Sequence, residues 1–166
     1  MIKLNLGCGT DLRSGYINID FRDAVVPAGI DYIKHDLNKP LPFDIYSCEE
    51  VFARDILEHF SWRDTDRIFA DWVRVLNIGG VISILVPNFE VHLKNLQDGV
   101  LDWKPERSKG AWGYFVSNVF GGQDYDGNFH HTTFTPETVK ELFERNSLSN
   151  IEITLEDRGI WAKAIK

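Results

Sequence analysis

The chain has 166 residues, of which 43% are hydrophobic, and this length fits one globular domain with a single core. Its 25 acidic and 18 basic residues give a formal net charge of -7, which disfavours nucleic acids and anionic membranes because both bind clustered Lys and Arg. Two cysteines are too few for a disulfide framework, and we find neither a leader peptide nor a run of about 18 apolar residues. We therefore expect a cytoplasmic protein that acts on a small molecule and does not enter the membrane.

Short apolar runs in the first half of the chain are rich in β-branched or aromatic residues and too brief for helices. They predict buried parallel strands at 4–6, 16–19, 32–34, 50–53 and 81–86. Gly9 and Asp20 are too close in sequence for a full crossover helix between the first two strands. We therefore expect residues 10–15 to form a loop or a single turn.

Two segments have the apolar spacing and end signals of helices. Residues 62–76 follow Ser61 as N-cap and stop at Gly79-Gly80, so they predict a crossover helix. Thr135 caps a second helix, which begins at Pro136 and ends near Asn146.

The tail predicts two further strands, at 151–155 and 160–165, joined by a hairpin turn. The expected fold is α/β: a Rossmann-like, mostly parallel seven-stranded sheet with an antiparallel C-terminal hairpin and helices on both faces. Residues 89–133 are rich in aromatic residues and glycine, without a strong period. We interpret them as a substrate cap inserted into a single domain that spans residues 1–166.

The strongest functional signal is the glycine turn Gly7-Cys8-Gly9 at the end of the first strand, followed by Asp20 at the end of the second. Glycines let backbone N–H groups approach a ligand closely, and a carboxylate at the neighbouring strand end can accept both hydroxyls of a ribose. The pair predicts a site for a nucleoside cofactor. The turn by itself is shared by several cofactor classes.

Five motifs follow one another along the chain: Leu4-Asn5-Leu6-Gly7-Cys8-Gly9, Asn18-Ile19-Asp20, His35-Asp36-Leu37, Leu57-Glu58-His59 and Leu76-Asn77-Ile78-Gly79-Gly80-Val81. In type and order they resemble the class I S-adenosylmethionine-dependent methyltransferases, and they look most like the small type 11 enzymes. The later Phe120-Gly121-Gly122-Gln123 and Asn128-Phe129-His130-His131 are similar to a subgroup suspected of acting on sugars. The resemblance covers nearly the whole chain.

The resemblance implies S-adenosylmethionine as cofactor and methyl transfer to an oxygen or nitrogen of a small polar metabolite, such as a sugar derivative. It implies that Gly7, Cys8 and Gly9 wrap the methionine part and that Asp20 binds the ribose. It also places Asp36 and Leu37 at the adenine, and backbone carbonyls of Ala53 and Arg54 at the methionine ammonium. Asn5 stands where the family commonly has an acidic residue, and there it can organise the loop through hydrogen bonds.

Histidines are the first candidates for a general base, because their pKa lies near neutrality. We favour His130, with His131 and His59 as the other catalytic candidates. The alternative is a structural role: one of His130 and His131 packs or faces water, and His59 with Glu58 only caps a helix.

No metal ion is expected. Asp124-x-Asp126-x-Asn128 lacks the glycine and the final glutamate of a calcium loop, and a site of His130, His131 and Asp124 is disfavoured because adjacent histidines rarely converge.

Three alternatives to a simple monomeric methyltransferase stay open. A nicotinamide-dependent oxidoreductase would need a third glycine at position 12, which is Leu, and an acid further along than Asp20. A non-catalytic S-adenosylmethionine-binding module or partner subunit would keep the cofactor site without turnover. Exposed apolar surface could also drive formation of a homodimer.

Overall fold

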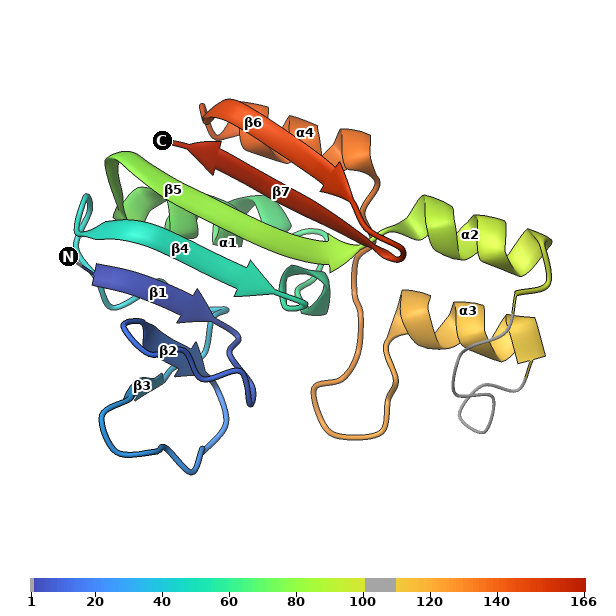
Figure 1. Ribbon diagram of the computed structural model, residues 1–166, viewed down its shortest axis with the longest axis horizontal. Coiled ribbons are helices and arrows are strands. Elements are labelled where there is room, and N and C mark those ends of the chain that lie inside the picture. The colour runs from blue at the N-terminus through green and yellow to red at the C-terminus, as the bar shows by residue number, and fades with distance from the viewer. Residues whose placement is uncertain (1, 101–109) are drawn as a thin grey trace.

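Seven strands form one sheet in the computed structural model of the chain, which describes residues 2–100 and 110–166 (Figure 1). The elements in chain order are β1 (Ile2–Leu6), β2 (Ile17–Asp20), β3 (Asp31–Lys34), β4 (Cys48–Arg54), the 3₁₀ turn η1 (Leu57–His59), α1 (Thr65–Val75), β5 (Leu76–Pro87), α2 (Phe89–Gln97), α3 (Gly110–Phe120), α4 (Pro136–Arg145), β6 (Ser149–Leu155) and β7 (Gly159–Ile165). The strand order is β3-β2-β1-β4-β5-β7-β6. β1 to β5 pair in parallel, and β7 is antiparallel to both β5 and β6. The predicted mixed sheet with an antiparallel end is confirmed.

The predicted element positions hold with small shifts at their ends. α1 begins at Thr65 rather than near residue 62, because the N–H groups of Asp64 and Thr65 both donate to the carbonyl of Ser61 and form a separate turn. β5 begins directly after α1 and includes the glycine pair that we expected to stop the helix. α4 begins as predicted, with the side chains of Thr135 and Thr138 capping its first turn.

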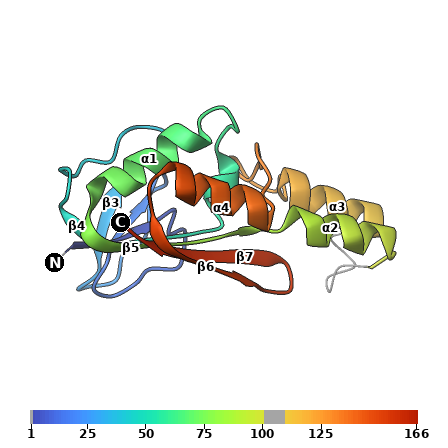
Figure 2. The ribbon, with the colours of Figure 1, turned by 90° about the horizontal axis from the view of Figure 1, so that it is seen from above.

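The helices on the sheet lie on one face, which corrects the expectation of helices on both. α1 and α4 lie side by side on the same side of the sheet, whereas α2 and α3 extend beyond its end (Figure 2). Within residues 2–100 and 110–166, no helix covers the opposite face. The cause is the shortness of the early connections: β1, β2, β3 and β4 are joined by turns and loops without a helix.

The connection from β1 to β2 covers part of that second face in place of a helix. The side chains of Asn5 and Asn18 are buried beneath it and bond to each other at 2.8 Å. Asn5 also donates to the carbonyl of Asp11, and Asn18 accepts from the N–H of Arg13. The guanidinium of Arg13 lies 3.5 Å from the ring centre of Phe52 and shields it from solvent. The predicted loop at residues 10–15 is confirmed, and these hydrogen bonds explain its order without a helix.

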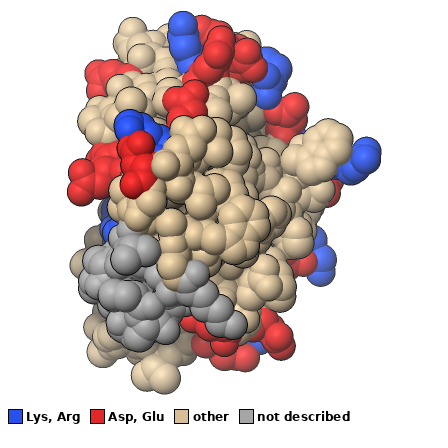
Figure 3. Space-filling view, turned by 90° about the vertical axis from the view of Figure 1, so that its right-hand side faces the viewer, with Lys and Arg blue, Asp and Glu red and all other residues tan. Residues whose placement is uncertain are grey.

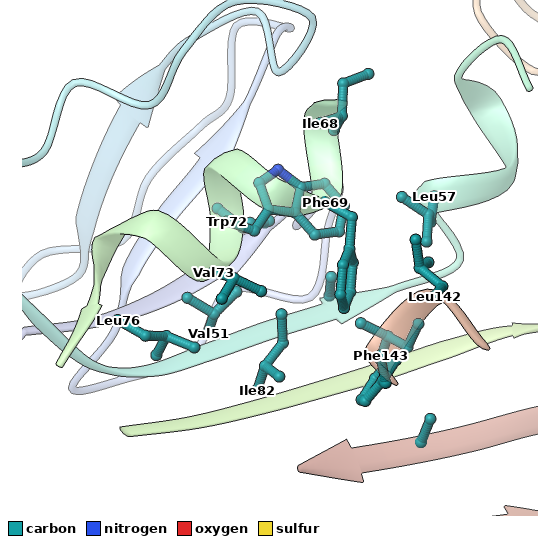
Figure 4. Close-up of a cluster of buried hydrophobic side chains, with 14 of the residues drawn as sticks. Val51, Leu57, Ile68, Phe69, Trp72, Val73, Leu76, Ile82, Leu142 and Phe143 are labelled. Carbon is teal, nitrogen blue, oxygen red and sulfur yellow. The ribbon is translucent and has the colours of Figure 1, made fainter. Parts of the chain in front are cut away.

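The main core lies between the sheet and the two helices on its covered face (Figure 4). α1 contributes Phe69 and Trp72, α4 contributes Phe143, and the strands contribute Val51 and Ile82. The ring centres of Phe69 and Phe143 are 5.0 Å apart, so the two helices pack on each other as well as on the sheet. The core fixes the carboxyl ends of the parallel strands, where the candidate site lies.

The predicted cap of residues 89–133 consists of two structural parts. α2 and α3 form a helical arm, and residues 121–134, which we call the strap, run back from the arm toward α4 (Figure 1). Residues 101–109 of the predicted cap lie outside the described residues. Among the helices that the structure describes, none is long and apolar enough to cross a membrane.

Candidate functional site

An open cleft of about 1040 Å³ lies at the carboxyl ends of the four strands β1 to β4. Residues that directly follow or end each of these strands line it, together with parts of η1 and the strap: Asn5, Gly7, Cys8, Gly9, Asp20, Phe21, Arg22, Asp36, Leu37, Asn38, Arg54, Asp55, Ile56, His59, Phe60, Tyr125 and Gly127 are among them. Ligands of parallel α/β sheets bind at this edge, where the strand order reverses between β1 and β4. The cleft is large enough for a nucleoside cofactor with a small second substrate beside it.

The glycine turn after β1 forms the floor of the cleft. Gly7 has a φ of +63°, and a Cβ atom there would lie 2.4 Å from Cγ1 of Ile56. The position therefore requires glycine for both conformation and space. The N–H of Cys8 donates to the carbonyl of Ile19, which ties the turn to β2. Burial, with a smaller effect of the charge on Asp20, raises the pKa of the Cys8 thiol to about 11, so the thiol stays protonated and packs as an apolar group.

Asp20 ends β2 as a buried carboxylate that the turn and the following loop hold in place. Its Oδ2 accepts from the N–H of Gly9 at 2.9 Å, and its Oδ1 accepts from the N–H of Arg22 at 3.0 Å and from Nε of Arg22 at 3.1 Å. Burial opposes the charge, but the hydrogen bonds from Arg22 and Gly9 outweigh it and lower the pKa of Asp20. Asp20 is therefore ionised at neutral pH and suited to accept hydrogen bonds from hydroxyls.

The guanidinium of Arg22 covers the carboxylate that a ribose would have to reach. A carboxylate offers about four acceptor positions, and Asp20 already uses three in short bonds. We expect Arg22→Ala to tighten the binding of S-adenosylhomocysteine by up to about fivefold, because the competing ion pair at this partly exposed arginine is weak. Calorimetric titration of both proteins measures this change. Weaker binding in the variant would show instead that Arg22 contacts the ligand.

Asp36 and Leu37 line the cleft beyond β3, next to Asp20. Oδ1 of Asp36 accepts from the N–H of Asn38 at 3.0 Å and from its side chain at 3.1 Å, and these bonds, the backbone one first, lower the pKa of Asp36. The carboxylate therefore shapes its own turn and faces the cleft as well. Leu37 is buried and forms an apolar wall beside it.

The two predicted residues of β4 differ in their positions. Arg54 lines the cleft, whereas the side chain of Ala53 packs in the core and the residue is not part of the lining. Asp55 follows in a left-handed backbone conformation with a φ of 50°. Partial burial raises the pKa of Asp55 despite the charge on Arg54.

Of the three catalytic candidates, His59 alone lines the cleft. Burial lowers its pKa, against the hydrogen bond between its Nδ1 and the carbonyl of Gly127. His130 lies behind it in an edge-to-face contact with ring centres 4.9 Å apart, and burial lowers the pKa of His130 to about 4. The ring of His131 is exposed, stacks on Phe129 and is not part of the cleft lining. Adjacent side chains on an extended segment point in opposite directions, so His130 and His131 do not act together.

Sequence reasoning did not identify Arg22, Asp55 and Gly127 as parts of the cleft wall. The position of Asp55 could have been found from sequence, because it directly follows the strand that ends with the candidates Ala53 and Arg54. Tyr125 and Gly127 come from the strap, whose return path is a tertiary feature that local patterns do not encode. The residues Gln123, Asp124 and Tyr125 follow the glycine pair of the strap, and Tyr125 is the one of the three that lines the cleft.

The comparisons with known proteins agree with this geometry. A family described as a methyltransferase domain matches residues 4–84, which run from β1 into β5. No curated protein matches the chain in sequence. A solved S-adenosylmethionine-dependent methyltransferase from Archaeoglobus fulgidus is similar to it, with a TM-score of 0.69 and 13% identity over 99% of this chain and 86% of that chain.

Two further solved structures are similar over nearly the whole chain. Burkholderia thailandensis 1,6-didemethyltoxoflavin-N1-methyltransferase, solved with 1,6-didemethyltoxoflavin and S-adenosylhomocysteine, has a TM-score of 0.60 and 11% identity over 99% of this chain and 70% of that chain. The citrinin polyketide synthase CMeT domain has a TM-score of 0.65 and 12% identity over 99% of this chain and 46% of that chain. This chain thus spans about half the length of the latter relative. At identities this low, the structural similarity demonstrates a shared fold and no more.

The sequence match and the fold support the same conclusion as the cleft. The matched segment holds the glycine turn, Asp20 and Asp36, which are the residues that the structure brings together at the edge of the sheet. Residues 4–84 match the methyltransferase-domain family, and the whole chain has the fold of solved S-adenosylmethionine-dependent methyltransferases.

Proposed function

We propose that the chain transfers a methyl group from S-adenosylmethionine to an oxygen or nitrogen of a small polar metabolite, with a sugar derivative as the favoured acceptor. The observation that supports the proposal is that one cleft contains both residues suited to bind a nucleoside and polar residues suited to bind an acceptor. Gly9 and Asp20 belong to the first group, together with Tyr125, whose ring centre lies 5.5 Å from the guanidinium of Arg22, and Asp55 and His59 belong to the second.

The proposed cofactor contacts follow the order of the strands. The turn Gly7-Cys8-Gly9 holds the methionine part, with Asn5 fixing the loop from behind, and Asp20 accepts from the ribose hydroxyls. Asp36 and Leu37 hold the adenine, as an acceptor for its amine and an apolar cover for its ring. At β4 we assign the contact with the methionine ammonium to the backbone carbonyl of Arg54 rather than Ala53, because Arg54 lines the cleft.

Methyl transfer is an in-line displacement, in which the bond from carbon to sulfur breaks while the bond from carbon to the acceptor forms. The cofactor supplies a positively charged sulfur that becomes neutral in this step. The protein must therefore align the acceptor with the methyl group and provide a route for the acceptor's proton. Asp55 and His59 are the lining residues that we propose for both tasks.

We propose that His59 contacts the acceptor, since His130 and His131 lie outside the cleft lining. His59→Ala is expected to lower kcat at least about tenfold, because the variant loses an acceptor contact. The affinity for S-adenosylhomocysteine should change by less than about threefold, since the proposed cofactor contacts lie elsewhere. Steady-state kinetics and calorimetry measure the two quantities.

His131→Ala is the matched control for this variant. It removes an exposed imidazole from the strap and leaves the cleft intact. Loss of kcat in the His131 variant with none in the His59 variant would contradict the assignment.

The proposed function is tested by incubating the protein with S-adenosylmethionine and a panel of nucleotide sugars, amino sugars and small amines. We expect S-adenosylhomocysteine to form together with a singly methylated product of one of these classes. Failure to bind S-adenosylhomocysteine at millimolar concentration would overturn the proposal. Binding without turnover on any acceptor would favour the alternative of a non-catalytic S-adenosylmethionine-binding module or partner subunit.

The helical arm offers a surface for a second copy of the chain, and we propose a homodimer through it. α3 carries no charged residue, and its Trp112 and Phe120 are 65% and 51% exposed. Figure 3 shows that uncharged side chains dominate this end of the molecule. Sedimentation at two protein concentrations tests for association. We propose no nucleic-acid partner, because the net charge of -7 opposes binding to phosphates. We also propose a cytoplasmic location.

A further inference from the structure

Three side chains with metal-binding atoms converge where the strap crosses η1. Glu58 and His59 belong to η1, and His130 belongs to the strap. One ligand atom from each lies within 4.8 Å of the others. Two atoms bound to one ion at bond lengths of about 2.0–2.2 Å lie no more than about 4.4 Å apart, so the three side chains need to move slightly closer together to bind a single ion.

The buried carboxylate of Glu58 has one oxygen without a hydrogen-bond partner among the described residues. That oxygen is Oε2, and the residue is 1% exposed. A buried carboxylate oxygen without a donor or a cation is costly, so the few that occur in native proteins require an explanation. A bound cation supplies the missing contact.

The backbone orients both imidazoles for metal binding. Nδ1 of His59 lies 3.0 Å from the carbonyl of Gly127, and Nδ1 of His130 lies 3.0 Å from the carbonyl of Asn118. A carbonyl can only accept, so each Nδ1 carries the proton and each Nε2 keeps a lone pair. Histidines that bind metals are commonly held in this way by a backbone carbonyl on the second nitrogen.

The main chain fixes the positions of the three ligands relative to one another. The N–H groups of His131 and Thr132 both donate to the carbonyl of Glu58, at 2.8 Å and 3.3 Å. These bonds register the strap on η1, so the cluster is set by the fold rather than by mobile side chains.

A fourth histidine lies next to the cluster. His92 of α2 borders a small closed cavity together with Glu58 and His130. It is 2% exposed, and neither of its ring nitrogens has a hydrogen-bond partner among the described residues. The cavity is thus bordered by two buried side chains whose polar atoms lack partners among the described residues, and His92 adds a second sign of a ligand to that of Glu58.

We propose that Glu58, His59 and His130 bind one divalent transition-metal ion of the zinc type. Two imidazole nitrogens and one carboxylate oxygen suit Zn²⁺ and its neighbours in the first transition row better than Mg²⁺ or Ca²⁺, which prefer oxygen ligands. Three protein ligands leave a coordination position open, to water, to His92 after a small shift, or to a ligand in the cleft. With Nδ1 bonded to Gly127 and Nε2 bound to the ion, His59 would meet the acceptor through this open position rather than through its own ring. The ion would link the strap to the end of β4. This site replaces the expectation of no metal, and it excludes His131 and Asp124.

The test uses protein stripped with a chelator and carrying no histidine tag, titrated with Zn²⁺ against a chromophoric chelator in the absence of cofactor. We expect one ion per chain and a rise in melting temperature on binding. Co²⁺ in place of Zn²⁺ should give visible absorption bands with imidazole ligation. Absence of stoichiometric binding by the unaltered protein would overturn the proposal, whatever its methyltransferase activity.

The variants Glu58→Gln and His130→Ala are each expected to weaken Zn²⁺ binding at least about 100-fold, which is the loss that follows from disturbing a ligand. His131→Ala is the matched control, and it should keep the affinity within about threefold because its ring points away. Equal losses in all three variants would point to non-specific binding by surface histidines and contradict the site. Binding of S-adenosylhomocysteine, measured on each variant, shows that the fold is intact.

Discussion

Asp20→Asn is expected to raise the dissociation constant of S-adenosylhomocysteine by about 100-fold or more. The ionised carboxylate is proposed to accept from both ribose hydroxyls once the Arg22 guanidinium moves aside and frees its acceptor position. Hydrogen bonds to a charged group contribute about 1.5–3 kcal/mol each. Asparagine keeps the size but loses the charge. Its amide also has one donor end, which would face either the N–H of Gly9 or the N–H of Arg22, both of which now donate to Asp20. Calorimetric titration measures the effect.

The control for this change is Asp23→Asn, three residues further along the same loop. The side chain of Asp23 is 89% exposed and pairs with Lys34 away from the cleft lining. Its loss should leave the affinity unchanged within about twofold, because exposed pairs contribute little. Thermal melting of both variants separates a loss of binding from a loss of folding. Equal affinities in the Asp20 and Asp23 variants would mean that the ribose does not bind at β2.

The sheet could be predicted from sequence because its strands are short apolar runs bounded by turn residues. β1, β2 and the C-terminal pair appear within one or two residues of the expected positions. The order of parallel strands followed by an antiparallel pair depends on connection lengths, which are also visible in sequence. The link between β1 and β2 has too few residues for a crossover helix, and the sequence shows this directly.

The layering could not be predicted in the same way. Whether a face carries helices depends on what the connections cover, and the links after β2 and β3 have no helix either. The buried bond between Asn5 and Asn18 replaces apolar helix packing with a polar contact to a loop. A buried amide pair has no periodicity, so hydrophobic pattern analysis cannot find it.

The candidate site likewise contains residues that could be predicted from sequence and residues that could not. The residues at strand ends, such as Asp20 and Asp36, were predictable because consecutive parallel strands deliver their carboxyl ends to one edge. The neighbours from the strap were not, because they come from a distant segment. His130 illustrates the limit: its location near the cleft was expected, yet it lies behind His59 and next to Glu58. Only the fold shows that this histidine belongs to a cluster with a buried carboxylate.

The positions of both sites depend on the packing of α1 against the sheet, and Trp72 is the side chain that tests it. The residue is 1% exposed, and its ring centre lies 6.1 Å from that of Phe60 and 6.3 Å from that of Phe69 (Figure 4). Trp72→Ala is expected to lower the free energy of unfolding by about 3–5 kcal/mol, through lost burial and the cavity left behind. Equilibrium unfolding in urea, followed by circular dichroism, measures the loss.

Trp62→Ala provides the comparison, since it removes the same side chain from a position just before α1. Trp62 is 64% exposed and contacts solvent and Arg63, so its loss should cost less than about 0.5 kcal/mol. The Trp72 loss is a large share of the roughly 5–15 kcal/mol that stabilises a typical domain. Phe60 directly follows η1, so loosening its contact with Trp72 should also weaken ligand binding in the cleft that Phe60 lines. Equal stabilities of the two variants would contradict the packing of α1 and, with it, the placement of η1 beside the strap.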